Sequence, residues 1–181
     1  MSAHGVFADF SEPMLEQARN GLKEYGDQLA FESLDYGDKA WVNRMQSHGP
    51  FDAVVSSYSI HHQPDVRKRE IYQEIYSLLE PGGWFINIEH IACEAQLTVD
   101  LFNKHIIDHW YEQEQLKGGT KTYEEVADTF MSRPDKDANI LLSVNAQCDW
   151  LREIGYEDVD CYFRVYELAV FGGHRPEVVK L

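Results

Sequence analysis

The chain has 181 residues, of which 44% are hydrophobic and 26% are charged, a composition typical of globular proteins and not of disordered or fibrous ones. Its 16 Lys and Arg against 31 Asp and Glu give a formal net charge of −15, which repels phosphate groups, so neither nucleic acid nor an anionic membrane is an expected partner. No apolar run reaches the ~20 residues that span a bilayer, and no signal peptide is recognisable. We therefore expect a soluble, cytoplasmic protein.

The first quarter of the chain alternates short apolar segments with amphipathic ones. Residues 5–10 predict a strand, and Ser11 followed by Pro13 predicts the start of a helix, because serine caps free backbone N–H groups and proline fits a first helical turn. The next expected elements are a strand at residues 29–34, a turn at residues 35–37 and a weaker helix at residues 39–46. These segments form two successive strand–helix units.

The same rhythm continues through residue 88. Residues 51–57 predict a strand buried on both faces, and residues 66–79 predict a helix that stops at the sequence Pro81-Gly82-Gly83. Residues 84–88 predict another buried strand. Strands that alternate with helices predict an α/β fold with a mainly parallel sheet and right-handed crossovers.

An insertion at about residues 94–142 interrupts this alternation. It predicts two helices, at residues 95–116 and 123–130, and an insertion of this kind in an α/β domain typically forms a lid or a cap over a substrate. Ser143 then caps a helix that Gly155 ends, and the strands at residues 159–163 and 168–171 are antiparallel because their connection is short. We expect a single domain, residues 1–181, that carries this helical cap.

Polar side chains follow three of the predicted strands. Asp9 follows the first strand, Asp35 the second, and Ser56 and Ser57 end the third. Ligands of open α/β sheets bind at the carboxyl ends of strands, where one carboxylate accepts hydrogen bonds from ribose hydroxyls and another accepts from an adenine amino group. From the residues alone, two interpretations of Asp9 and Asp35 are equally favoured: they bind a nucleoside, or they are ordinary turn or cap residues.

Five segments, taken in order, resemble the class I S-adenosylmethionine-dependent methyltransferases. They are Ala8-Asp-Phe-Ser-Glu-Pro-Met-Leu-Glu-Gln-Ala-Arg19, Leu34-Asp-Tyr36, residues 51–62, Leu78-Leu-Glu-Pro-Gly-Gly-Trp84 and residues 150–159. The resemblance implies a Rossmann-like methyltransferase sheet and S-adenosyl-L-methionine as the cofactor. It also implies the cofactor-binding residues, which are Asp9 for the ribose, Phe10 and Met14 beside the adenosine, Asp35 and Tyr36 at the adenine edge, and Ser56, Ser57 and Tyr58 beside the methionine part.

One departure from this family concerns its first motif. Members begin with a strand that ends in a Gly-x-Gly-x-Gly loop, whose glycines let the backbone approach the cofactor, and this sequence has no such motif. That strand would be the central one, and each buried backbone group left unpaired by its absence costs roughly 1 to 3 kcal/mol. We therefore expect a rearranged sheet, or a homodimer formed by strand exchange, and weak or no S-adenosylmethionine binding by this form.

Histidines are the candidates for acid–base chemistry. A base is needed where the methyl acceptor must lose a proton, and His62 is the candidate catalytic base, with His61, Glu89 and His90 also at strand ends. His105 and His109 lie one helical turn apart and, with Glu89 and His90, are weak candidates for a metal site, although such pairs are more often solvated. Seven aromatic residues could wall an apolar acceptor site or belong to the core: Phe102, Trp110, Tyr111, Tyr123, Phe130, Tyr162 and Tyr166.

The resemblance predicts an S-adenosylmethionine-dependent methyltransferase that acts on a small-molecule acceptor beneath the helical cap. One alternative is a non-catalytic, truncated methyltransferase fold that serves as a dimerising or binding module. Another is a hydrolase that uses a His/Glu metal cluster.

Overall fold

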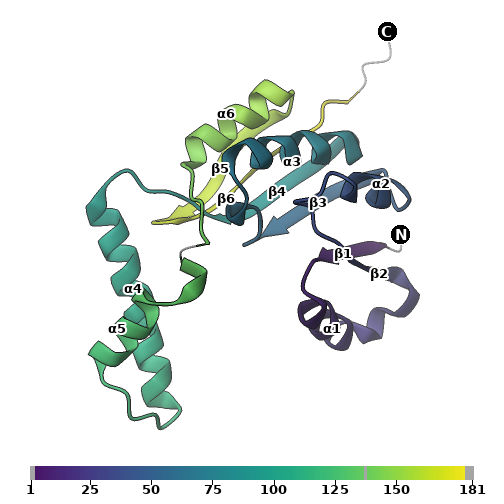
Figure 1. The fold of residues 1–181 in the computed structure, drawn as a ribbon. Helices are drawn as coiled ribbons and strands as arrows, with labels where there is room; N and C mark the ends of the chain where they lie inside the picture. Colours follow the sequence, from purple (N-terminus) through teal and green to yellow (C-terminus); the bar gives the residue numbers. More distant parts are fainter. Residues whose placement is uncertain (1–2, 137, 178–181) are drawn as a thin grey trace. The chain divides into compact units, whose positions relative to one another are not determined.

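The computed structural model describes residues 3–136 and 138–177, and these residues form two compact units with a boundary between Phe51 and Asp52 (Figure 1). Each unit is described by itself, so the organisation of the chain as a single domain stays a prediction. None of the helices in the described ranges is both long and apolar enough to cross a membrane.

The first unit is built on two parallel strands. Strand β1 (Gly5–Asp9) pairs with β2 (Leu29–Ser33) in a register that runs from Gly5 opposite Leu29 to Asp9 opposite Ser33. Helix α1 (Glu12–Gly21) contacts both strands and buries Leu15, since its apolar residues recur at helical spacing. A 3-10 segment (Lys23–Gln28) leads into β2, and α2 (Trp41–Gln46) follows it.

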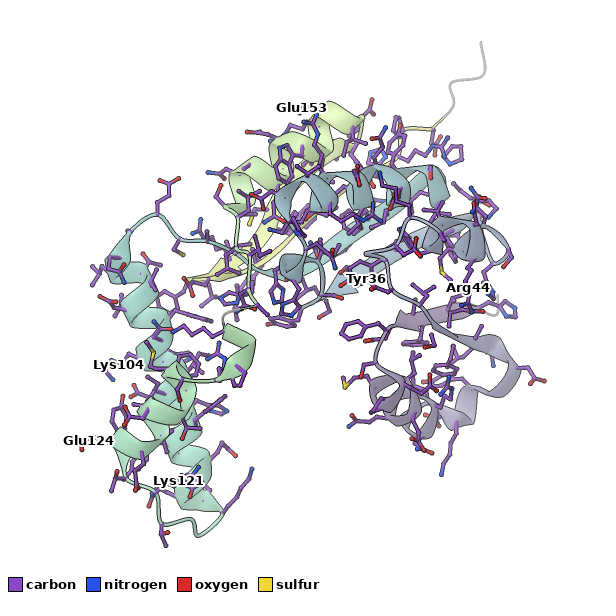
Figure 2. All side chains as sticks on the ribbon, viewed as in Figure 1. Tyr36, Arg44, Lys104, Lys121, Glu124 and Glu153 are labelled. Atoms are coloured by element: carbon purple, nitrogen blue, oxygen red, sulfur yellow. The ribbon has the colours of Figure 1, made fainter. Side chains whose placement is uncertain are left out.

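Charged groups tie α2 back to β2. Arg44, labelled in Figure 2, donates a 3.1 Å hydrogen bond to the carbonyl oxygen of Ser33 and forms an ion pair with Glu32. His48 lies 2.9 Å from the other oxygen of Glu32, and this hydrogen bond is the largest cause of the lowered pKa of the Glu32 carboxyl. The predicted strands and the weak helix of this unit are thereby confirmed.

The start of α1 differs in detail from the prediction. Ser11 stands at the N-cap position, but its side chain makes no capping hydrogen bond. Its backbone N–H instead donates to Asp9 Oδ1 at 2.8 Å. The start of α1 is therefore stabilised by the proline in its first turn and by the turn at Asp9, and not by the serine hydroxyl.

The second unit contains a four-stranded sheet in the order β3-β4-β6-β5 (Figure 1). Strand β6 lies between β4 and β5 and is antiparallel to both, which confirms the predicted antiparallel C-terminal pair and gives a mixed α/β fold. The elements of this sheet and the helices α3 and α6 that pack against it are β3 (Phe51–Ser57), α3 (Asp65–Leu78), β4 (Leu79–His90), α6 (Val144–Ile154), β5 (Glu157–Val165) and β6 (Leu168–His174).

Aromatic side chains form much of the core of this sheet and its helices. The ring of Phe85 on β4 lies 5.5 Å from that of Tyr72 on α3 and 6.1 Å from that of Tyr156, measured between centroids. Phe85 and Phe171 are both completely buried. Helix α6 begins where the Ser143 hydroxyl accepts from Ala146 N at 3.3 Å, and Gly155 ends it at φ 112°, as predicted.

Two expectations for this sheet are wrong in part. The predicted burial of β3 on both faces fails, because β3 is an edge strand and Val55 is 63% exposed. Strand β4 also begins five residues earlier than Trp84, at Leu79, so the Pro81-Gly82-Gly83 segment lies within the strand. The strand extends this far because Gly82 N donates to Arg175 O at 2.7 Å and Gly83 O accepts from Arg175 N at 2.8 Å.

Strand pairing divides the described strands into two sheets. In the described part of the chain, β1 pairs with β2 and β3 pairs with β4, and the two pairs belong to separate sheets. The predicted rearrangement of the sheet around β1 and β3 stays a prediction, as does strand exchange in a homodimer.

Helices α4 (Gln96–Leu116) and α5 (Tyr123–Met131) form the predicted insertion, followed by a short 3-10 turn (Pro134–Lys136). A capping box starts α5: Glu125 N donates to the Thr122 hydroxyl at 3.2 Å, and Thr122 N donates to the Glu125 carboxylate at 2.8 Å. Ile107, Val126 and Phe130 form a small buried cluster between the two helices. On the outer surface of α4, Lys104, labelled in Figure 2, pairs with Asp108 at 2.6 Å.

Candidate active site

The turn that follows β3 places two histidines beside the end of β4. Tyr58 adopts a left-handed backbone with φ 48°, which is uncommon for a residue with a side chain, and its N–H donates to Ile88 O at 2.9 Å. A short 3-10 turn (Ile60–His62) comes next. Non-glycine residues in this conformation are frequent at functional sites, and this one redirects the chain toward the β4 terminus.

Glu89 on β4 organises these histidines. It is 1% exposed, and its Oε1 accepts from the Nδ1 of His61 at 2.5 Å, since a carboxylate can only accept. The same carboxylate accepts from the backbone N–H of His61 at 3.1 Å and from that of His90 at 3.0 Å. The arrangement fixes the ring of His61 with its Nδ1 proton toward Glu89, which leaves Nε2 as a proton acceptor.

His90 has a second carboxylate partner. Its Nε2 lies 3.2 Å from Glu167 Oε2, and Glu167 is in the turn between β5 and β6. Burial lowers the pKa of His90 below the ordinary 6.5, and the hydrogen bond to Glu167 acts in the opposite direction. His90 is therefore favoured in its neutral form.

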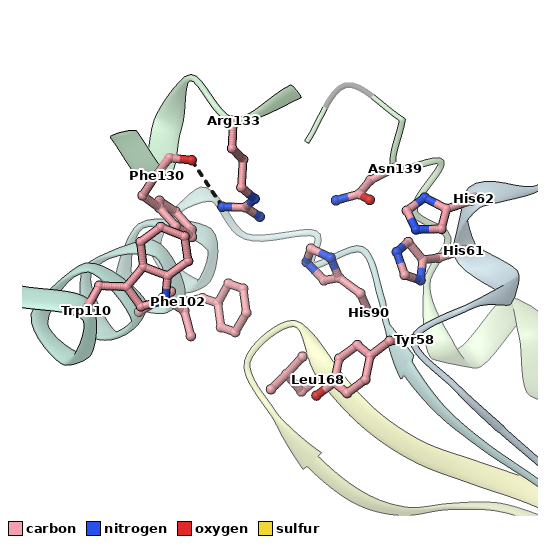
Figure 3. A pocket seen from close by; sticks show the side chains of 11 residues that line it. Tyr58, His61, His62, His90, Phe102, Trp110, Phe130, Arg133, Asn139 and Leu168 are labelled. Atoms are coloured by element: carbon pink, nitrogen blue, oxygen red, sulfur yellow. Dashed lines mark hydrogen bonds between the residues drawn. The ribbon is translucent and has the colours of Figure 1, made fainter. Parts of the chain in front are cut away.

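These histidines open onto a cavity of about 540 Å³ in the second unit (Figure 3). Its size falls in the range of small-molecule sites. The residues that line it are Tyr58, His61, His62, His90, Phe102, Ile106, Trp110, Phe130, Arg133, Asn139 and Leu168. The histidines thus face the predicted helical insertion across a cavity.

The insertion supplies the apolar wall of the cavity. Phe102 on α4 lies 5.6 Å from the ring of His90, and Trp110 meets Phe130 of α5 edge to face at 5.4 Å. Of the seven aromatic residues considered above, these three line the cavity, while Tyr111 and Tyr123 pack on each other at 5.5 Å. Three of the seven residues therefore line the cavity, and two others pack against each other.

The structure distinguishes His61 from His62, the histidine that the sequence favoured as base. The centroids of the two rings lie 3.9 Å apart, and both side chains line the cavity. His62 is exposed, and its Nδ1 is hydrogen-bonded to the backbone carbonyl oxygen of Ala138 at 3.3 Å. His61 is 6% exposed and has a carboxylate partner, which stabilises the imidazolium formed when a base takes up a proton. By this geometry His61 is the better candidate.

Arg133, Asn139 and Glu167 are not among the site residues predicted from the sequence. Arg133 and Asn139 belong to a loop whose polar composition gave no sign of a site. The one available signal was Glu89, an acidic residue within the strongly apolar β4 segment, because a buried carboxylate requires a partner.

The weak metal candidates do not come together. His105 and His109 are exposed on α4, while Glu89 and His90 are engaged with His61 and Glu167 at the end of β4. Among residues 3–136 and 138–177, no group of three or more His, Cys, Asp or Glu side chains is placed to hold a metal ion. The hydrolase hypothesis therefore loses the cluster on which it depended.

Asp9 and Asp35 lie at the same end of the two-stranded sheet of the first unit. Asp9 ends β1 opposite Ser33, and Leu34 N donates to Asp9 O at 3.1 Å, so Asp35 follows at the adjoining strand tip. Each carboxylate also accepts from a backbone N–H two residues on, at 2.8 Å from Ser11 and 2.7 Å from Gly37. The two residues therefore have the predicted neighbouring placement and also the turn role that was its alternative.

The other predicted cofactor residues divide between the two units. Phe10 and Met14 are 69% and 56% exposed, so they lie at the surface and core packing does not explain them. Tyr36 is half-buried in the first unit. Ser56 is half-buried and Ser57 exposed at the end of β3 in the second unit, where Tyr58 lines the cavity.

Comparisons with known proteins agree with this architecture. Residues 1–83 match the family model described as a methyltransferase domain. The chain is 26% identical over 175 residues to a carboxy-S-adenosyl-L-methionine synthase of Desulfotalea psychrophila, covering 95% of this chain and 65% of that protein. It is 28% identical over 161 residues to a demethylmenaquinone methyltransferase of Clavibacter sepedonicus, covering 87% and 58%.

A solved structure shows the same fold. An O-methyltransferase family protein from Burkholderia thailandensis superposes with a TM-score of 0.62 at 14% sequence identity, over 97% of this chain and 44% of that one. The chain thus spans less than two thirds of the length of each of these three proteins. The match includes the second unit, in which the histidine cavity lies.

Proposed function

Since the chain belongs to the class I S-adenosylmethionine-dependent methyltransferase family, we propose that it transfers a methyl group to a small-molecule acceptor bound in the histidine cavity. The observation that carries the proposal is the buried pair of His61 and Glu89 at the wall of that cavity. The non-catalytic alternative has no support from the comparisons.

S-adenosylmethionine, the cofactor of this family, supplies a methyl group activated by a sulfonium. The residues of the first unit fit its nucleoside part. Asp9 and Asp35 offer acceptors for ribose hydroxyls and an adenine amino group, and the exposed Phe10 and Met14 offer apolar contact to a base. By their position in the sequence, Tyr36, Ser56, Ser57 and Tyr58 are proposed to complete the binding residues.

His61 is the proposed general base. Its Nδ1 donates to Glu89, so Nε2 takes the proton from an acceptor hydroxyl as the new methyl bond forms, and Glu89 stabilises the resulting imidazolium. Apart from this proton transfer, methyl transfer asks the protein chiefly to hold the nucleophile in line. The walls contributed by α4 and α5 support that positioning, because they limit how a flat acceptor can bind.

A methyl-transfer assay tests this proposal. The full chain is incubated with S-adenosylmethionine carrying a labelled methyl group, at millimolar concentration, and with a panel of phenols and hydroxyquinones. We expect a methylated product from at least one acceptor, and His61→Gln should lower its rate by roughly 10²- to 10⁴-fold. His4→Gln, which changes an exposed histidine outside the cavity, serves as the control.

Two results would contradict the proposal. One is cofactor binding without product from any acceptor, which is what a non-catalytic binding module would give. The other is a product whose rate is the same in the wild type and in His61→Gln.

A further inference from the structure

Two of the histidines that line the cavity share one arrangement. His61 is hydrogen-bonded to Glu89 and His90 to Glu167, and the two carboxylates are buried, at 1% and 7% exposed. A carboxylate only accepts hydrogen bonds, so the ring nitrogen that faces it carries the proton, which is Nδ1 in His61 and Nε2 in His90. The other nitrogen of each neutral ring is therefore a hydrogen-bond acceptor.

These two acceptor nitrogens are available to a ligand. Within the described residues, no hydrogen bond engages Nε2 of His61 or Nδ1 of His90. Neither atom is sealed in the core, since the buried side-chain polar atom without a partner in this part of the chain is Asn87 Oδ1. Burial lowers the pKa of His90, which favours the neutral ring and keeps its Nδ1 able to accept.

The two rings lie close enough together to contact one ligand. Their centroids are 5.8 Å apart and their planes meet at 70°, and Figure 3 shows both rings at the cavity. His62 differs, because it is exposed and its Nδ1 is hydrogen-bonded to the carbonyl oxygen of Ala138. A ligand that engages His61 and His90 together must therefore place two donor groups side by side.

The rest of the wall favours a ligand with a flat, apolar body. Phe102, Trp110 and Phe130 come from α4 and α5, and the ring of Phe102 lies 5.6 Å from that of His90. Aromatic side chains favour planar groups that stack or pack edge to face. A planar ring that carries hydroxyls on two neighbouring carbons combines this shape with two adjacent donors.

We propose that the acceptor is an aromatic ring with hydroxyls on two neighbouring carbons, of which one donates to His61 Nε2 and the other to His90 Nδ1. This inference rests on the proposed function, since it names the substrate class of the same cavity, but the binding preference is measurable without methyl transfer. A ring with one engaged hydroxyl, bound by His61 alone, is the competing possibility.

Equilibrium binding of a matched pair of isomers tests the inference. In the presence of EDTA, the full chain is titrated by calorimetry with 2,3-dihydroxynaphthalene and with 2,6-dihydroxynaphthalene, which share one ring system but differ in whether the hydroxyls are neighbours. We expect the wild type to bind the 2,3-isomer about tenfold more tightly, because one further hydrogen bond contributes roughly that factor. His61→Phe and His90→Phe, which keep a flat ring without an acceptor, should each make the two affinities equal.

Two control variants and one measurement on the wild type accompany the titrations. His105→Gln changes an exposed histidine of α4 that does not line the cavity and should keep the tenfold preference. Trp110→Ala should weaken both isomers by a similar factor, and thermal unfolding of each variant shows whether it is folded. In the wild type labelled with ¹⁵N-histidine, the 2,3-isomer should shift the NMR signals of His61 Nε2 and His90 Nδ1 together.

Equal affinity of the wild type for the two isomers would overturn the inference, as would a preference that survives in folded His90→Phe or a shift of only one of the two nitrogen signals. A preference that appears only without EDTA would also overturn it, since the neighbouring hydroxyls would then bind a metal ion. So would unchanged binding of both isomers by Trp110→Ala, which would place them elsewhere.

The inference and the proposed function can fail separately. Methyl transfer without the preference for neighbouring hydroxyls leaves the proposed function standing. The preference without transfer to any acceptor contradicts the function and not this inference.

Discussion

A single carboxylate, Glu89, accounts for most of the geometry of the candidate active site. It accepts hydrogen bonds from the ring of His61 and from the backbone of His61 and His90, so it fixes the turn after β3 against the end of β4. A buried charge of this kind is retained in a fold when all of its acceptors are satisfied. The same bonds serve folding and the proposed chemistry.

Replacement of Glu89 by glutamine should therefore lower stability as well as activity. The glutamine amide keeps the shape but turns one acceptor into a donor that faces backbone N–H groups. We expect the free energy of unfolding to fall by about 1–3 kcal/mol, measured by urea denaturation. Glu16→Gln, an exposed residue of α1, should change it by no more than about 0.5 kcal/mol, and equal values for the two variants would argue against the role given to Glu89.

His90 should make the stability of the chain depend on pH. Burial lowers its pKa from the ordinary value of about 6.5, with Glu167 opposing and His61 and Arg133 reinforcing the shift. Between the native and the ordinary pKa the unfolded chain binds more protons, so the free energy of unfolding decreases as the pH falls from about 7 through this interval. His90→Gln should flatten the decrease, whereas His4→Gln should not; a slope unaffected by His90→Gln would refute this prediction.

At the scale of elements, helices with clear end signals were predicted almost residue for residue. The insertion helices α4 and α5 and the helix α6 are examples. For α6, the capping residues Ser143 and Gly155 are local signals that do not depend on the rest of the fold. The exposure of β3 and the early start of β4 were missed, because both depend on which strand or loop lies alongside. An acceptor site beneath the insertion was predicted, but Arg133 was left out of it for the same reason: Arg133 and His61 are 72 residues apart, and only the tertiary fold places both at the cavity.

The capping box of α5 offers a test at this scale. Thr122→Ala removes the acceptor of the Glu125 N–H, and loss of such a cap costs about 1 kcal/mol. We expect a Tm lower by roughly 2–4 °C, measured by calorimetry. Thr120→Ala, an exposed threonine just outside the helix, is the matched control, and a similar Tm for both variants would show that the cap does not stabilise the fold.

For the whole molecule, the sequence predicted a sheet without its central strand, and this stays a prediction; the described strands form two sheets, β1-β2 and β3-β4-β6-β5. The resemblance to a family was sufficient for the fold class. The resemblance does not tell which strand pairs with the free edges of β1 and β3, because the family's glycine-rich first strand has no counterpart in this sequence. The predicted strand-exchanged homodimer is one answer.

Hydrogen exchange measures this directly. In a monomer, the amides of the edge strand β3 should exchange much faster than those of β6, which is paired on both sides. If a second copy covers β3, its protection should rise with protein concentration, in step with the dimer fraction from analytical ultracentrifugation. Rapid exchange of β3 that is independent of concentration would rule out strand exchange.

We propose that this chain binds an adenosyl cofactor through Asp9 and Asp35. Titration of the ¹⁵N-labelled chain with S-adenosylhomocysteine, followed by NMR, tests this binding. We expect shifted amide signals at residues 9–14 and 35–36, with an affinity weaker than micromolar because this sequence has no Gly-x-Gly-x-Gly motif. Asp9→Asn should abolish these shifts and Glu16→Gln should keep them. Unchanged signals in both segments at millimolar ligand, or shifts that persist in Asp9→Asn, would show that these two carboxylates do not bind the cofactor.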